Sequence, residues 1–308
     1  MNKANEANKV KVKGFFSTLF TLFTSFTFSL QAASTSSVAV DAPSAFSAAG
    51  STVSLNGTSL LEVARSVGLG REEYVYAVHW GVLKVGHATL GSPDIVRHQD
   101  REAYHLVSTA RSLSFFDAFY KVRDRNEAWL DAATFRSLGF LKNLREGRYR
   151  RDEEIEYNHA TGRFKATIKK KKGQIVHEEG SMKPWAYDVL SALYWVRAQN
   201  LNVGDEISID VNTRKDWPMV VKVLKREKVR TPAGDFQCLK VEPMMRDEGI
   251  FVQKGKSMHI WLTDDARKIP VLLKAEVFIG SVKAELQEIV YNDLSPSLDS
   301  SSGTPKME

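Results

Sequence analysis

Cysteine is nearly absent from this chain of 308 residues, which contains only Cys238. A single cysteine excludes an internal disulfide bond and excludes any Cys-x-x-Cys metal or redox pair. Its apolar neighbours Phe236, Leu239 and Val241 predict that Cys238 is a small apolar residue within a strand. The fold must therefore depend on its hydrophobic core.

Familiar catalytic motifs are also missing, since the chain has no Gly-x-Ser-x-Gly elbow, no P-loop and no His-Glu-x-x-His helix. His79 and His87 fall on facing strands of a predicted hairpin, but the sequence supplies no third metal ligand. Asp264 and Asp265 could form a carboxylate pair, although adjacent residues of an extended chain point to opposite faces. A turn in which aspartate caps backbone amides is favoured. We therefore predict no catalytic residue, no metal ligand and no cofactor.

Charge of one sign is not in large excess. The formal charge is +6, and residues 1–33 contribute four lysines and one glutamate, which leaves 6 − 3 = +3 for the rest. A charge of this size in a chain of this length argues against a nucleic-acid partner.

The N-terminus predicts export. A lysine-bearing segment precedes the apolar run Phe15–Leu30, which ends at Gln31-Ala32-Ala33. This order is typical of a secretory signal peptide cleaved after Ala32 or Ala33. The run is short for a membrane span and is interrupted by serine and threonine, so we predict no stable transmembrane span after processing. We expect a periplasmic protein, with secretion or an uncleaved N-terminal anchor as alternatives.

Composition divides the chain into four parts. Residues 1–33 form the predicted signal peptide, and residues 34–59 are a Ser/Ala-rich segment that predicts a flexible leader. Residues 60–292 contain nearly all of the periodic pattern and predict a single β-rich domain, which can begin with a short helix at Leu60–Val67. Residues 293–308 are rich in serine and proline and are expected to be disordered.

A period of two dominates the domain and predicts about a dozen strands. Apolar residues alternate along Tyr74–Trp80, which predicts a hairpin with the strand that ends at Leu90. Three charged strands are expected between Arg136 and Glu178, and the aromatic segment Leu113–Tyr120 fits a helix or a strand. The segment Thr231–Asp235 predicts a hairpin turn with a positive φ at its glycine.

One segment, Pro184–Gly204, predicts a long buried helix instead. Its apolar residues cover more of the helix surface than the single stripe of an amphipathic helix. Asp188 is a suitable N-cap, and Gly204 closes the loop that follows the helix. Arg197 follows the apolar surface and, if buried, needs a carboxylate or carbonyl partner. We predict a mainly β fold, in which a strongly curved antiparallel sheet or a partly closed β-barrel packs on this central helix.

The aromatic residues of this segment can fill the core or line a cavity between the helix and the sheet. The candidate cavity-lining residues are Trp185, Tyr187, Tyr194 and Trp195.

Several short segments occur together in a recognisable combination. They are Tyr74-Val75-Tyr76 with Gly81 and Gly86, Tyr187-Asp188-Val189-Leu190-Ser191-Ala192-Leu193-Tyr194 ending in Arg197, Thr231-Pro232-Ala233-Gly234-Asp235-Phe236, and Trp261-Leu262-Thr263-Asp264-Asp265 running to Pro270. This combination, which spans Tyr74 to Tyr291, resembles the bacterial domain-of-unknown-function 3108 family. The resemblance implies an exported envelope protein without an assigned activity, so it supplies no catalytic residue.

These observations lead to one expected function and two alternatives. We expect a non-enzymatic periplasmic envelope protein that binds an apolar ligand or a partner segment in the concave face of its sheet. The alternatives are an envelope hydrolase that uses carboxylates such as Asp264 or Asp265, and a purely structural or interaction module. The identity of the envelope ligand or protein partner stays open.

Overall fold

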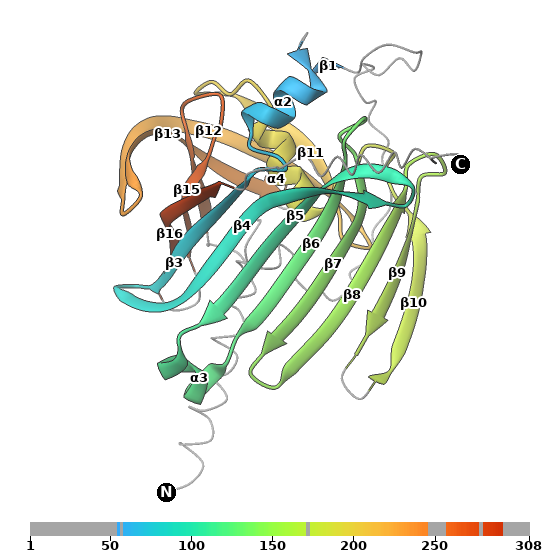
Figure 1. Ribbon diagram of the computed structural model, residues 1–308, viewed down its shortest axis with the longest axis horizontal. Helices are drawn as coiled ribbons and strands as arrows, with labels where there is room; N and C mark the ends of the chain where they lie inside the picture. The colour runs from blue at the N-terminus through green and yellow to red at the C-terminus, as the bar shows by residue number, and fades with distance from the viewer. Residues whose placement is uncertain (1–53, 56–57, 171–172, 246–256, 277–279, 292–308) are drawn as a thin grey trace, which may run out of the picture.

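The fold is taken from a computed structural model, which describes residues 54–55, 58–170, 173–245, 257–276 and 280–291. Fourteen strands form one antiparallel sheet in the order β10-β9-β8-β7-β6-β5-β4-β3-β16-β15-β14-β13-β12-β11 (Figure 1). The prediction of a mainly β, antiparallel protein is confirmed.

The strands have the following bounds: β3 Glu72–Trp80, β4 Leu83–His98, β5 Arg101–Ser112, β6 Arg123–Asp131, β7 Ser137–Glu146, β8 Tyr149–Asn158, β9 Arg163–Lys169, β10 Ile175–Ser181, β11 Glu206–Asn212, β12 Asp216–Thr231, β13 Gly234–Met245, β14 Met258–Thr263, β15 Pro270–Glu276 and β16 Ser281–Tyr291. Two short strands, β1 Ser54–Leu55 and β2 Thr58–Ser59, pair with each other outside this sheet.

The order of the strands gives the sheet two halves. The chain starts in the middle at β3, moves strand by strand to the edge at β10, and then crosses to the opposite edge at β11. From there it returns strand by strand until β16 pairs with β3. The crossing contains the helix α4, Val189–Arg197, which contacts β5 and β6 as well as β11. Strands that are distant in the sheet order therefore lie against one helix.

The edge strands β10 and β11 are not paired with each other, but side chains join the two edges of the sheet. The Tyr157 hydroxyl donates to the backbone oxygen of Asn212 over 2.8 Å. Arg214, in the turn between β11 and β12, donates to Glu153 over 2.9 Å and to Glu178 over 2.6 Å. Because Glu153 lies on β8 and Glu178 on β10, these bonds connect the β3–β10 half of the sheet to the β11–β12 hairpin at the opposite edge.

The helices differ from the sequence predictions in length. The predicted N-terminal helix is α2, Leu60–Ser66, where Ser59 and Glu62 form a capping box. The aromatic segment that fitted both a helix and a strand contains a helix, α3, Ser114–Tyr120. The prediction of a long helix over Pro184–Gly204 is wrong, because α4 has only nine residues. Backbone hydrogen bonds between Tyr187 and β11 hold the residues before α4 in an extended conformation.

The strand count also needs a correction. Four strands, β7 to β10, replace the three expected between Arg136 and Glu178, and β6 was not predicted. The buried positions of β6 include the polar residues Asp124 and Asn126, so the apolar alternation that marks a strand is absent there.

Two local predictions are confirmed. Gly234 begins β13 with φ +139°, and Thr231 pairs with it across the hairpin turn. Cys238 is a free, fully buried residue of β13, and burial raises the pKa of its thiol to about 12.

Some expectations fall on other parts of the chain. The predicted signal peptide, residues 34–53 of the predicted leader and the C-terminal tail lie outside the described residues. Within the described ranges, no helix has both the length and the apolar character required to cross a lipid bilayer.

Candidate functional site: an apolar cavity beside α4

The start of α4 is fixed to the sheet by a buried carboxylate. Asp188 accepts hydrogen bonds from the backbone N–H groups of Leu190 and Ser191 over 2.8 and 2.9 Å, and from the Ser137 hydroxyl of β7 over 2.7 Å. Burial raises the pKa of Asp188, while the hydrogen bonds oppose that shift. The predicted N-cap is therefore confirmed, and it also ties the helix to β7.

The end of α4 is fixed by the fully buried side chain of Arg197. Its Nε donates to the carbonyl oxygen of Lys268 over 3.0 Å, and its Nη2 donates to the carbonyl oxygens of Val67 and Arg267 over 2.8 and 3.0 Å. These carbonyl partners confirm the prediction made for a buried arginine at this position, and they join α4 to the segments next to β3 and β15.

Aromatic rings and a second layer of charge complete the surroundings of Arg197. Its guanidinium carbon lies 4.7 Å from the centre of the Tyr194 ring and 5.3 Å from that of Tyr74. The Tyr74 hydroxyl accepts from Arg197 and donates to Glu72 over 2.6 Å, and Glu72 in turn pairs with Arg267 over 2.6 Å. Tyr74 thus links Arg197 to Glu72, a carboxylate that also pairs directly with Arg267.

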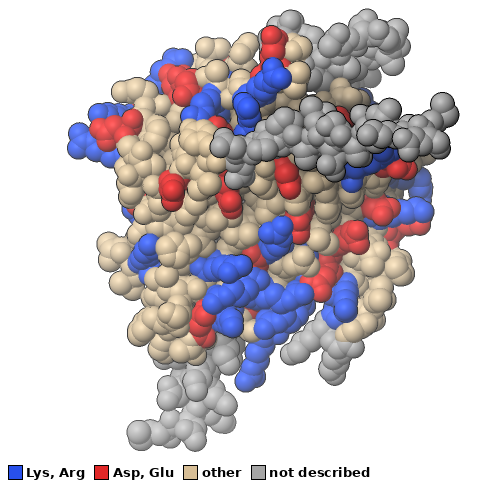
Figure 2. All heavy atoms as spheres, in the orientation of Figure 1, with Lys and Arg blue, Asp and Glu red and all other residues tan. Residues whose placement is uncertain are grey.

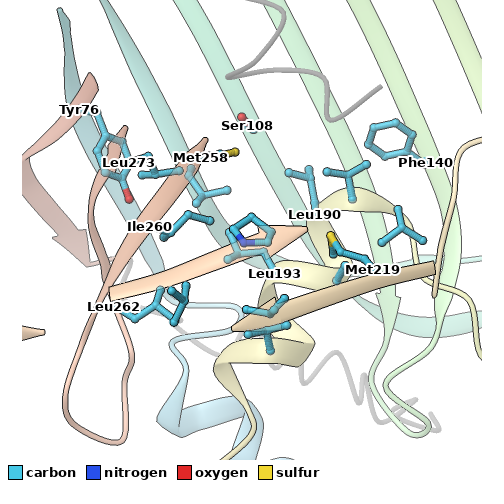
Figure 3. A pocket seen from close by; sticks show the side chains of 18 residues that line it. Tyr76, Ser108, Phe140, Leu190, Leu193, Met219, Met258, Ile260, Leu262 and Leu273 are labelled. Atoms are coloured by element: carbon cyan, nitrogen blue, oxygen red, sulfur yellow. The ribbon is translucent and has the colours of Figure 1, made fainter. Parts of the chain in front are cut away.

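Between these two attachments, α4 borders a cavity of about 90 Å³ (Figure 3). The eighteen residues that line it come from α4 and from strands of both halves of the sheet. They are Tyr76, Leu90, Ser108, Phe140, Val189, Leu190, Ala192, Leu193, Val196, Val211, Met219, Val221, Val241, Pro243, Met258, Ile260, Leu262 and Leu273.

The wall of this cavity is almost entirely apolar. No charged side chain lines it, and the only side-chain polar groups are the hydroxyls of Tyr76 and Ser108. The Tyr76 hydroxyl is already engaged, because it donates to the backbone oxygen of Pro270 over 2.7 Å, and burial raises its pKa well above the usual value. A wall of this character offers water few hydrogen-bond partners and suits an apolar group.

The cavity lies where two hydrophobic clusters meet. Leu190 and Phe140 belong to a large cluster that includes β3–β9 and parts of β12–β16, whereas Ala192 and Met219 belong to a second cluster around β11–β15. Figure 3 shows Leu190 and Leu193 on α4 between Phe140 and Met219 on one side and strand residues such as Ile260 on the other. Residues of α4 belong to both clusters, so the helix lies where they meet.

The interior changes character at the edge of the cavity. The register places Ser108 opposite Asn126, Asn126 opposite Lys142, and Lys142 opposite Glu153. All four are buried, and we call them the polar row. Burial lowers the pKa of Lys142 to about 8. The adjacent row, on the α4 side, is Leu106, Ala128, Phe140 and Ile155.

The four aromatic residues singled out in the sequence lie around α4 but not in the wall of this cavity. Trp185 is 47% exposed and donates to Asp210 over 2.8 Å. The rings of Tyr187 and Trp195 lie 5.8 Å apart, and Tyr194 is buried against Arg197. A cavity-lining role for Trp185, Tyr187, Tyr194 and Trp195 stays a prediction.

The carboxylates considered in the sequence are held in other contacts. Asp265 accepts from the backbone N–H groups of Arg267 and Lys268, each over 3.0 Å, which is the capping turn that was favoured. Asp264 pairs with Arg226 over 2.7 Å. Within the described part of the chain, no group of three or more His, Cys, Asp or Glu side chains could hold a metal ion.

Comparison with one solved structure supports the fold. A β-barrel-like protein of domain-of-unknown-function family DUF1849 from Brucella abortus is similar with a TM-score of 0.50 and 11% identity, covering 74% of this chain and all of that one. A candidate lipoprotein from Parabacteroides distasonis and a candidate exported protein from Bacteroides fragilis each give a TM-score of 0.31 and 10% identity, covering 71% of this chain and 94% of theirs. At 11% identity, the similarity to the Brucella abortus protein concerns the fold alone.

No protein with a curated description matches this chain. A family model does match, over residues 75–287, and its description is "Protein of unknown function (DUF3108)". The matched range runs from β3 to β16 and includes α4 and every residue that lines the cavity. It agrees with the resemblance found in the sequence, and the chain therefore belongs to the DUF3108 family.

Proposed function

We propose that this chain is a non-enzymatic, periplasmic envelope protein whose curved sheet packs on α4 and holds an apolar ligand or partner segment in its concave face. The cavity beside α4 is the observation that supports this proposal. Its eighteen lining residues include no charged side chain, and they come from both halves of the sheet. A ligand there would contact both hydrophobic clusters at once.

The size of the cavity limits what it can hold. Pockets that enclose a whole drug-sized ligand have volumes of roughly 300–1,000 Å³, whereas this cavity measures about 90 Å³. An engineered cavity of about 150 Å³ is enough for benzene. We therefore propose that it takes a small apolar group, such as the end of an alkyl chain. Met219 and Met258 line it and have flexible side chains that can adjust to such a group.

The alternatives receive less support from the geometry. A hydrolase based on Asp264 or Asp265 requires a free carboxylate, but the first pairs with Arg226 and the second caps a turn. A purely structural or interaction module requires no ligand at all. Binding of an apolar probe separates this alternative from the proposed function.

The experiment uses two neighbouring leucines of β15 as a matched pair. Leu273 lines the cavity, whereas Leu272 points to the other face of the strand, and both are partly buried. We expect Leu273→Trp to fill the cavity and to weaken binding of an apolar naphthylamine dye by about tenfold or more, equivalent to about 1.4 kcal/mol. Leu272→Trp should leave dye binding unchanged, with thermal melts confirming that both variants fold.

Two results would count against ligand binding. If the wild-type protein binds no dye, and no lipid accompanies it in native mass spectra, the interaction module becomes the better proposal. If the two tryptophan variants bind dye equally, the ligand site lies away from the cavity. The compartment is tested separately, because export with processing predicts a mature N-terminus at Ala33 or Ser34 in the periplasmic fraction.

A further inference from the structure

One end of the sheet concentrates exposed apolar side chains. Because neighbouring strands are antiparallel, the connections β3–β4, β5–β6, β7–β8 and β9–β10 lie at the same end. We call these four connections the α3 rim, and its described residues are 81–84, 111–123, 146–150, 169–170 and 173–175. It holds six of the twelve exposed large hydrophobic residues in the described chain, namely Val82, Leu83, Phe115, Phe119, Tyr149 and Ile175.

The phenylalanines of this rim are held outward by the structure of α3. Phe115 and Phe119 are 70% and 67% exposed, and their rings lie 5.8 Å apart. On the other side of the helix, Tyr120 is buried, and Phe116 packs against the core. The helix therefore presents a fixed aromatic face to solvent.

An ion pair fixes α3 to the following strand. Asp117 accepts from both terminal nitrogens of Arg123, over 3.1 and 2.5 Å, and also from the Ser112 hydroxyl. These bonds link the helix to the end of β5 and the start of β6, so the exposed rings are anchored rather than carried on a free loop.

The charge of the rim is strongly basic. Its described residues include eight Lys and Arg but only two acidic residues, Asp117 and Glu146. Asp117 pairs with Arg123, and Glu146 is buried, so neither offsets the exposed basic side chains. Figure 2 shows Lys and Arg gathered on the lower part of this face of the molecule, toward the end where α3 lies in Figure 1. The exposed basic residues are Lys84, Arg111, Lys121, Arg148, Arg150, Lys169 and Lys170.

The opposite ends of the same strands lack this combination. Among the described residues, the turns β4–β5, β6–β7 and β8–β9 contain none of the exposed large hydrophobic side chains. The one phenylalanine there, Phe135, is buried. These three turns therefore lack the exposed aromatic residues that α3 carries.

We propose that the α3 rim docks on the surface of a lipid bilayer that contains anionic lipids. Phe115 and Phe119 would enter the headgroup region, while the surrounding Lys and Arg contact lipid phosphates. A second copy of the chain is a poorer partner, because pairing two rims would bring like charges together. This docking is independent of whether the cavity binds a ligand.

Vesicle co-sedimentation tests the proposal. The chain from Ser34 onward is used, because the apolar run Phe15–Leu30 would itself insert into lipid, whereas every described residue is retained. Vesicles of phosphatidylcholine alone are compared with an equimolar mixture of phosphatidylcholine and phosphatidylglycerol. We expect binding to the anionic mixture that weakens as salt is added.

Two double variants and one control locate the surface. Phe115→Ser with Phe119→Ser, and Lys121→Glu with Arg148→Glu, should each weaken vesicle binding by about tenfold or more. The control, Leu61→Ser with Arg71→Glu, alters exposed residues at or near α2, away from the rim, and should bind like the wild-type chain. Thermal melts check that all variants fold, since every altered side chain is exposed.

Three outcomes would overturn the proposal. The first is a wild-type chain that does not bind anionic vesicles. The second is vesicle binding that the two rim variants leave unchanged, which would place the contact elsewhere. The third is a rim-dependent dimer in sedimentation velocity without vesicle binding, which would make a second copy the partner.

Discussion

Two regions of the interior bury a positive charge in different ways. At the end of α4, Arg197 donates to three backbone carbonyls and lies against two aromatic rings, and its pKa is raised despite burial. In the polar row, Lys142 lies opposite Glu153, and burial lowers its pKa to about 8. A guanidinium can share its charge among several fixed acceptors, whereas an ammonium concentrates its charge on one atom. The surroundings of Arg197 therefore favour its charged form, whereas those of Lys142 disfavour it.

The largest expected effect comes from removing the arginine. Arg197→Ala should lower the free energy of unfolding by about 3–5 kcal/mol, because it removes the contacts that join α4 to the β3 and β15 segments and leaves Glu72 with less compensation. Arg197→Lys should recover only part of this loss, since lysine cannot donate in several directions within one plane. Urea unfolding measures both variants, and equal stability of Arg197→Ala and the wild type would contradict the assigned role.

The polar row should be visible in the pH dependence of stability. Because the folded-state pKa of Lys142 is about 8 and its ordinary value is 10.5, the unfolded chain binds more protons between these values. Stability should therefore rise with pH across this interval, by up to about 3 kcal/mol from this residue.

The matched variant for that measurement is Lys142→Met, which should lack this rise. The difference between the pH profiles of the two proteins removes the contributions of the other titrating groups. One of these is Cys238, whose raised pKa lowers stability as pH increases. Parallel curves for the two proteins would show that Lys142 titrates normally.

A smaller effect is expected at the start of α4. Asp188→Ala removes the N-cap and should cost about 1–2 kcal/mol in the free energy of unfolding. Asp188→Asn keeps an acceptor for the helix N–H groups and avoids burying a charge, so it should cost less. If both variants lose the same amount in denaturant melts, the bonds from the Ser137 and Ser191 hydroxyls, and not the cap, are the important contacts.

The smallest expected effect lies at the boundary between the two regions. Ser108 belongs to the polar row and also lines the cavity, so Ser108→Val extends the apolar wall by one residue. The free energy of unfolding should change by less than about 1 kcal/mol, and dye binding should tighten slightly. A large loss of stability would mean that the hydroxyl is required by the polar row.

Local sequence signals predicted the features that depend on neighbouring residues. Asp188 before an apolar run marked the helix start, the Pro232–Gly234 turn marked a hairpin, and Arg197 was expected to have a carboxylate or carbonyl partner if buried. The length of α4 was overestimated because the backbone pairing of Tyr187 with β11 is a contact between distant segments.

The remaining features depend on strand register, which a single sequence does not reveal. β6 escaped prediction because Asp124 and Asn126 face the interior where apolar residues were expected. The cavity wall combines residues as distant as Tyr76 and Leu273, so its composition follows only once strand order and the position of α4 are known. The aromatic residues that stood out in the sequence are elsewhere around the helix.

The pairing of β16 with β3 has a consequence for the order of folding. Each half of the sheet, β3–β10 and β11–β16, is a meander in which every strand pairs with its neighbour in sequence, so each can form through contacts of short separation. Joining them requires the last strand, Ser281–Tyr291, to find one of the first, Glu72–Trp80. Closing so long a loop is entropically costly and slow. A chain that emerges gradually, as during translocation, would therefore complete its central ladder only after nearly all of its length is available.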